Sequence, residues 1–148
     1  MATSYPFSHI AVIGIGLIGT SIVHAAKYRN LPVTFAAYDN NPDVRAEAAD
    51  LLSHIKITTT LQQAIEDAEL VILAVPVGVM EQVIKDIAPY LRPGCVITDT
   101  GQQNVPLSVM LSLLFQRPVI LSRVTPWQVQ NFQALQLDLP ACLKRAIG

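Results

Sequence analysis

The sequence predicts an α/β fold with a doubly wound, mainly parallel sheet, and three observations support this class. Near the N-terminus, a short apolar strand runs through a glycine turn straight into a helical segment, over residues 9–28. Strand-like and helix-like segments then alternate as far as residue 101. Apolar residues make up 51% of the 148 residues, as expected of one domain whose sheet is covered on both faces.

The first strand and its turn, residues 9–20, read HIAVIGIGLIGT and contain the spacing G-x-G-x-x-G. In such a turn Gly14 permits the tight bend, and Gly16 lets the backbone approach a pyrophosphate. Gly19 lets the helix pack closely on the strand. The start of the helix would present free N–H groups and a partial positive charge to phosphates. The motif therefore predicts a dinucleotide site of the Rossmann type.

Asp39 supports this interpretation, because it closes the next expected strand, residues 33–38, and lies 20 residues after Gly19. An acid at that place suits the hydroxyls of the adenosine ribose and repels a 2′-phosphate. The sequence thus favours NAD over NADP as the cofactor. The alternative is an ordinary glycine turn with a solvated Asp39, and the joint pattern argues against it.

Turn and capping signals divide the rest of residues 1–101 into further elements. Asn41 precedes Pro42 as the cap of a helix, and Thr60 with Gln63 forms a capping box for a brief one. The apolar run at residues 70–75 is typical of a central parallel strand, and Pro76 ends it. Strands are expected over 9–13, 33–38, 54–57, 70–75 and 95–98, and helices over 17–28, 42–52, 61–67 and 79–90.

Composition argues against several other classes of protein. A net charge of −1 gives no sign of a nucleic-acid or membrane-surface partner, and no apolar run is long enough to span a bilayer. Cys95 and Cys142 make neither a disulfide framework nor a metal site, and Cys95 is expected to be a small buried apolar residue. We find no signal peptide in the first residues, so we expect a cytoplasmic protein.

Four segments in order, GIGLIGTS, AYDNNP, DAELVILAVPVG and LRPGCVITDTG, carry a resemblance to one family. Together they resemble the nucleotide-binding domain of prephenate and arogenate (cyclohexadienyl) dehydrogenases, over residues 9–101. The resemblance implies an oxidoreductase of tyrosine biosynthesis, which decarboxylates prephenate or arogenate oxidatively and passes a hydride to NAD(P). It also implies that the cofactor is bound by Gly14, Gly16, Leu17, Ile18, Gly19, Asp39, Val75, Pro76, Asp99 and Thr100.

The resemblance stops after Gly101. The family continues with a serine, a variable residue and a lysine, and later with a GHP-small-AG segment that carries a catalytic histidine. Here Gln102 and Gln103 follow instead, and no histidine occurs after His54. We therefore assign no catalytic residue and no metal ligand. We also expect the family's helical C-terminal domain, which builds the dimer and closes the substrate site, to be missing.

Possible codons for the last third of the chain, read one base earlier, give family-like strings. Residues 102–105 then permit SAKR, residues 124–134 permit GHPMAGTEFSG, and residues 135–148 permit a string that begins PAAGLASLFETR. We interpret residues 1–101 as the NAD(P)-binding domain and residues 102–148 as out-of-frame translation, which could form poorly packed helices. The alternative is a diverged, shortened relative with a C-terminal segment of its own.

Three functional hypotheses follow. The first is a dehydrogenase of the prephenate/arogenate type, truncated here and without activity. The second is another small Rossmann reductase, such as a 3-hydroxyacid dehydrogenase or a pyrroline-carboxylate reductase; the ITDTG segment argues against it. The third is a non-catalytic NAD-binding module, which rests on fold analogy alone. The expected partner is a small-molecule substrate, with no nucleic acid and no membrane.

Overall fold

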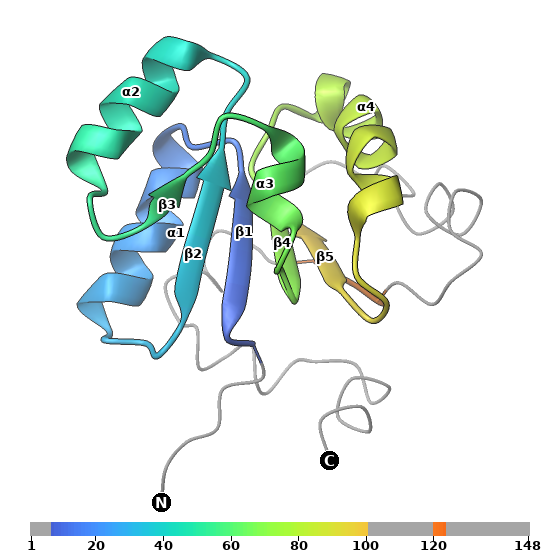
Figure 1. The fold of residues 1–148 in the computed structure, drawn as a ribbon, viewed down its shortest axis with the longest axis horizontal. Helices are drawn as coiled ribbons and strands as arrows, with labels where there is room; N and C mark the ends of the chain where they lie inside the picture. Colours follow the sequence, from blue (N-terminus) through green and yellow to red (C-terminus); the bar gives the residue numbers. More distant parts are fainter. Residues whose placement is uncertain (1–6, 101–119, 124–148) are drawn as a thin grey trace, which may run out of the picture.

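Over residues 7–100 and 120–123, which are the residues described, the computed structural model forms one six-stranded sheet in the order β3-β2-β1-β4-β5-β6 (Figure 1). Every pairing between neighbouring strands in it is parallel. The strand order reverses between β1 and β4, and a doubly wound sheet opens a crevice at the carboxyl ends of such a pair. The strands are β1 (His9–Ile13), β2 (Thr34–Tyr38), β3 (Lys56–Ile57), β4 (Leu70–Leu73), β5 (Val96–Asp99) and β6 (Ile120–Arg123).

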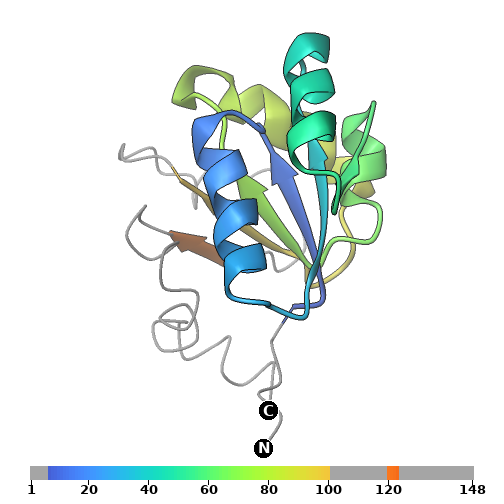
Figure 2. The same cartoon turned by 90° about the vertical axis from the view of Figure 1, so that its left-hand side faces the viewer.

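Helices cover both faces of the sheet, and Figure 2 shows α1 and α4 on opposite sides of the strands. They are α1 (Leu17–Tyr28), α2 (Pro42–Leu51), α3 (Leu61–Ile65) and α4 (Val77–Ile87), which a 3-10 turn, η1 (Ala88–Tyr90), extends. Alternate residues of β1 point to opposite faces. Val12 therefore joins the core beneath α1 and α2, and Ile13 joins the core beneath α3 and α4.

The predicted α/β class with a mainly parallel sheet is confirmed, and β1 and α1 have the predicted bounds. Other boundaries differ by one to a few residues. β3 starts at Lys56 instead of residue 54, because the N–H of Ile55 donates to the carbonyl of Leu52 and prolongs the turn after α2. α4 starts at Val77 instead of residue 79, directly after Pro76, whose φ of −56° suits a helix start. In the part of the chain that is described, no helix is both long enough and apolar enough to cross a membrane.

β6 is a strand that the sequence analysis did not predict. Its backbone pairs in register with all four residues of β5, from Val96 with Ile120 to Asp99 with Arg123. It lies within residues 102–148, for which we expected helices. A short apolar run is sufficient for such an edge strand, because the pairing depends on backbone hydrogen bonds. The helices expected elsewhere in that segment lie outside the described residues.

Candidate functional site

The glycine turn joins the carboxyl end of β1 to the start of α1, beside the first residues after β4. Gly14 has a φ of +92°, and a Cβ there would lie 2.5 Å from the carbonyl oxygen of Ala74. A Cβ on Gly19 would collide with the carbonyl oxygen of Gly14. Both positions therefore accept only glycine, because strand, turn and helix approach one another too closely for a side chain. No ligand is needed to explain these two glycines.

Gly16 differs from the other two glycines. Its φ of −70° and ψ of −156° are open to any residue, and no described protein atom lies within 4 Å of a Cβ placed there. Gly16 is also the N-cap of α1, where it has no side-chain cap, and the first turn of the helix has no acidic residue. The open space above Gly16 and the N–H groups behind it suit the approach of a phosphate.

Asp39 is half-buried at the end of β2, and its carboxylate is held from two sides. Oδ2 accepts the N–H of Ile15 at 3.1 Å, and Oδ1 accepts the N–H of Asn41 at 3.0 Å. An ionised carboxylate has about four acceptor positions, so each oxygen can still accept a hydroxyl of a ligand. The bond from Ile15 places the acid against the glycine turn, where its position 20 residues after Gly19 predicted it to lie.

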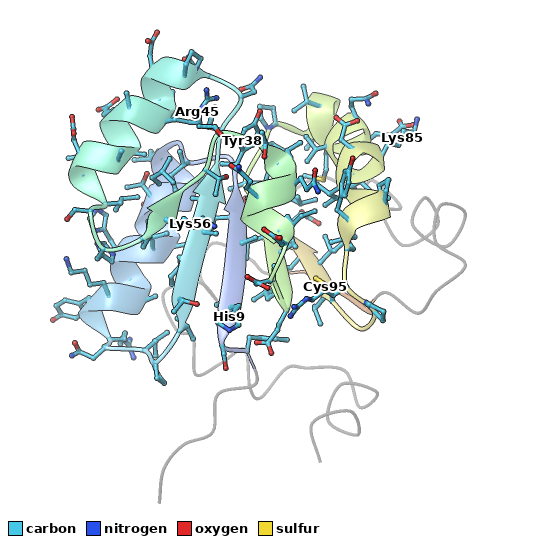
Figure 3. All side chains as sticks on the ribbon, viewed as in Figure 1. His9, Tyr38, Arg45, Lys56, Lys85 and Cys95 are labelled. Carbon is cyan, nitrogen blue, oxygen red and sulfur yellow. The ribbon has the colours of Figure 1, made fainter. Side chains whose placement is uncertain are left out.

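Arg45 fixes the backbone on the other side of Asp39, and the sequence analysis missed this. Its Nη1 donates to the carbonyl oxygen of Asp39 at 2.7 Å, and its guanidinium carbon lies 5.6 Å from the centre of the Tyr38 ring (Figure 3). A cation over an aromatic face is attracted by the ring. An arginine one turn into the helix after the acid was the only signal for this contact in the sequence.

The other predicted cofactor residues lie at the same carboxyl edge of the sheet. Val75 follows β4 beside the glycine turn, and a Cβ placed on Gly14 would lie 3.0 Å from its side chain. Pro76 is exposed after it. Asp99 ends β5 and Thr100 follows it. Both are buried, and Thr100 donates its N–H to the carbonyl of Leu73 at 3.1 Å. Leu17 and Ile18, 87% and 45% exposed, stand on the first turn of α1. That these residues bind a cofactor stays a prediction.

No described histidine lies at this edge of the sheet. His9 begins β1 at the opposite, amino edge, where its Nδ1 lies 2.6 Å from the hydroxyl of Thr34 (Figure 3). His24 lies in the second half of α1, and His54 precedes β3. Among the described residues, no cluster of three or more histidine, cysteine or acidic side chains could hold a metal ion.

Comparison with known families identifies the domain. The model of the family described as "Prephenate dehydrogenase, nucleotide-binding domain" matches residues 23–135, from the middle of α1 onward. A cyclohexadienyl dehydrogenase of Zymomonas mobilis is 41% identical over 107 residues, which are 72% of this chain and 36% of that protein. A prephenate dehydrogenase of Lactococcus lactis is 30% identical over 107 residues, 72% of this chain and 30% of the relative. The chain thus spans about a third of the length of these relatives.

Solved structures share the fold. A prephenate dehydrogenase from A. aeolicus, in complex with hydroxyphenyl propionate and NAD⁺, has a TM-score of 0.66 and 22% identity, over 84% of this chain and 42% of that one. A pyrroline-5-carboxylate reductase from Coxiella burnetii has a TM-score of 0.67 and 18% identity, over 78% of this chain and 43% of that one. At such identities the likeness shows the architecture alone.

Proposed function

Since the chain belongs to the prephenate dehydrogenase family, whose nucleotide-binding domain it shares, we propose that residues 7–100 bind NAD as the cofactor half of a prephenate- or arogenate-type dehydrogenase. The observation that carries this proposal is the contact between Asp39 and the glycine turn. It puts an acceptor for ribose hydroxyls beside a surface that suits phosphate.

The pyrophosphate of NAD would lie over Gly16 at the start of α1, and the adenosine ribose would lie on Asp39. NADP carries a further phosphate on that ribose, which would face the carboxylate of Asp39 and be repelled. Arg45 offers less compensation than a free arginine would, because its guanidinium already bonds to the carbonyl of Asp39 and covers Tyr38. Both arguments favour NAD.

The nicotinamide end of the cofactor would lie by Val75, Pro76, Asp99 and Thr100, at the carboxyl ends of β4 and β5. NAD, when bound, supplies the hydride acceptor. The residues of this chain would orient the cofactor and exclude water from one side of it, since Asp99 and Thr100 are both buried.

We further propose that residues 102–148 are out-of-frame translation and that this chain binds NAD without oxidising prephenate or arogenate. The support is the order of three family-like strings in the shifted frame, one of which restores the family's histidine segment. A histidine suits the role of base, because its pKa lies close to neutrality. Prephenate or arogenate is proposed as the substrate of the family's complete enzyme, not of this chain. We propose a cytoplasmic location from the sequence.

Calorimetric titration of the 148-residue chain with NAD and with NADP tests cofactor binding. We expect NAD to bind at least about tenfold more tightly, which corresponds to roughly 1.4 kcal/mol. Asp39→Asn should narrow this ratio, since it removes the repelling charge and keeps one acceptor oxygen. Equal affinities of the unsubstituted chain for the two cofactors would contradict the assigned role of Asp39, and no binding of either would contradict the site.

The out-of-frame interpretation has a separate test. The nucleotide sequence around the codon of Gly101, read in all frames, should continue openly as SAKR and later as GHPMAG. An assay of NADH formation with prephenate and with arogenate should show no turnover by this chain. Turnover, or the absence of the open shifted frame, would refute the interpretation and leave NAD binding by residues 7–100 unaffected.

A further inference from the structure

A second hollow lies at the other end of α1, near the amino edge of the sheet. We name it the α1–β2 pocket: a cavity of about 550 Å³ between the last turns of α1, the start of β2 and the turn that leads into β3. The residues that line it include Val23, Lys27, Phe35 and His54, and none of the predicted cofactor residues is among them.

The pocket exists because β3 is short. Its two residues pair with Ala36 and Ala37, so Thr34 and Phe35 have no neighbouring strand on that side of β2. The turn that follows α2 closes only part of the gap, through His54 and Ile55. The start of β2 is thus left open on its outer side, beneath the end of α1.

The floor of the pocket is apolar. Val23, Ala26 and Phe35 belong to the buried core beneath α1, and they line the pocket from the helix and from β2. Leu31 and Ile55 are half-buried and add apolar sides. Sites for small molecules commonly enclose about 300–1,000 Å³ with mostly apolar walls. The α1–β2 pocket falls within this range of volume and composition.

A cation, Lys27, and the imidazole of His54 stand at the rim of the pocket. Lys27 lies on α1, and His54 faces it from the turn before β3. Burial lowers the pKa of His54, and the neighbouring charges of Lys27 and His24 lower it further. Among the described residues, no aspartate or glutamate lines the pocket. Within the described residues, ion pairs join Lys85 to Glu81 and Arg92 to Asp67, and Lys27 and His54 take part in neither.

Lys56 also borders the pocket, but its charge belongs to the other face of the sheet. Its neighbour Ile57 packs on the core beneath α1, and successive residues of a strand point in opposite directions. Lys56 accordingly lies over the α3 side, where it also lines a smaller hollow with Gln63 and Ala64 (Figure 3). Among the described residues, the groups that can bind an anion in the pocket are therefore the ammonium of Lys27 and a ring N–H of His54.

We propose that the α1–β2 pocket binds a small amphipathic anion. Its apolar body would lie on Val23, Ala26 and Phe35, and its carboxylate would lie between Lys27 and His54. A lysine that no described acid neutralises, beside an imidazole N–H and above an apolar floor, attracts a ligand with both properties and favours neither a neutral nor a cationic one. This site is independent of the proposed cofactor site, which lies at the opposite edge of the sheet.

A purely structural role for Lys27 would have a different signature. Lys27 lies in the last turn of α1, where a cation stabilises the partial negative charge of the helix end. In that case its loss would lower stability slightly, and the affinity of the pocket would not depend on the charge of the ligand. The experiment therefore compares two probes of the same shape and different charge.

The probes are phenylacetate and its neutral counterpart phenylacetamide, titrated into the ¹⁵N-labelled 148-residue chain. We expect phenylacetate to shift the amide signals of Val23, Ala26 and Ile55, and to bind at least about fivefold more tightly than phenylacetamide. Lys27→Gln should weaken phenylacetate binding severalfold and leave phenylacetamide binding unchanged. Lys85→Gln, an exposed lysine on α4, is the matched control and should change neither affinity.

Equal affinities for the two probes would overturn the proposal. So would signal shifts confined to residues outside the pocket, or a Lys27→Gln chain that binds phenylacetate as tightly as the unsubstituted one. Equilibrium dialysis with radiolabelled probes gives the same comparison of affinities without resolved spectra. Neither readout depends on NAD, so this proposal and the proposed function can fail separately.

Discussion

The carboxylate of Asp39 accepts the backbone N–H of Ile15 at 3.1 Å, and this bond joins the end of β2 to the glycine turn after β1. The second oxygen accepts the N–H of Asn41 at 3.0 Å and so reaches the cap of α2. One side chain thus holds two loops at the carboxyl edge of the sheet. An acid at this place serves the fold without any ligand, and the same two bonds fix its orientation for the ribose contact that we propose.

Replacing Asp39 should therefore destabilise the domain even without cofactor. We expect Asp39→Ala to lower the free energy of unfolding by about 1–3 kcal/mol, because two backbone N–H groups lose a charged acceptor. Asp39→Asn should cost less, since its amide oxygen can still accept one of them. Urea unfolding followed by circular dichroism gives both values, and an Asp39→Ala chain as stable as the unsubstituted one would contradict the structural role.

Substitutions at two glycines of the turn should have different effects, one on the stability of the domain and the other on NAD binding. We expect Gly19→Ala to lower the free energy of unfolding by more than about 2 kcal/mol, because its Cβ meets the backbone of Gly14. Gly16→Ala should leave stability within about 0.5 kcal/mol, since the space around it is open. The same substitution should weaken NAD binding at least about tenfold by filling the space that the pyrophosphate would occupy.

Unfolding and NAD titration of the two variants test this pair of expectations. A stable Gly19→Ala chain would show that the helix can move away from the turn. A Gly16→Ala chain that binds NAD normally would remove Gly16 from the proposed site, whatever its stability.

Local signals explain what the sequence predicted well. The glycine spacing, the proline at the start of α2 and the capping residue Thr60 each act over a few residues, and the structure has the corresponding turn and caps. Asn41 accepts the N–H of Asp43 at 2.9 Å, and Thr60 accepts the N–H of Gln63 at 3.3 Å. The central strands could also be predicted from the sequence, because strands that helices cover on both faces are apolar throughout.

Contacts between distant segments explain what the sequence could not predict. β6 is a four-residue strand whose partner, β5, lies more than twenty residues earlier in the chain. The position of Arg45 over Tyr38 depends on how α2 packs beside β2. The α1–β2 pocket follows from the early end of β3, which no residue pattern marked. Each depends on tertiary packing, and propensity carries little information about that.

Glu69 should make stability depend on pH in the acidic range. Its Oε2 accepts the N–H groups of Ser8 and His9, at 2.5 and 3.1 Å, and so fastens the start of β1. The bond from Ser8 is the main cause that holds the pKa of Glu69 below its ordinary value, and the charges of His9 and Arg92 add to it. Because the folded-state pKa is depressed, the stabilisation is complete above the ordinary glutamate pKa and is lost as pH falls through the folded value.

We therefore expect Glu69→Gln to cost about 1 kcal/mol near neutral pH, after allowance for solvent around this carboxylate. The difference from the unsubstituted chain should close as the solution is acidified below the ordinary glutamate range. Glu47→Gln, at an exposed position on α2, is the control for loss of one negative charge. A Glu69→Gln deficit that stays constant with pH would show that the hydrogen bonds do not require the ionised carboxylate.

Cys95 should be unreactive as long as the domain is folded. It is 3% exposed among the core residues beneath α3 and α4, and burial raises the pKa of its thiol to about 12. Since the thiolate is the reactive form, we expect a disulfide reagent at mildly alkaline pH to modify Cys95 roughly a thousandfold more slowly than a free thiol. A Cys142→Ser background isolates this thiol, and the same reaction in urea gives the unfolded rate. Native and unfolded rates that agree would mean that β5 opens readily to solvent, and the edge of the sheet that carries Asp99 and Thr100 would then be too loose to hold a nicotinamide ring.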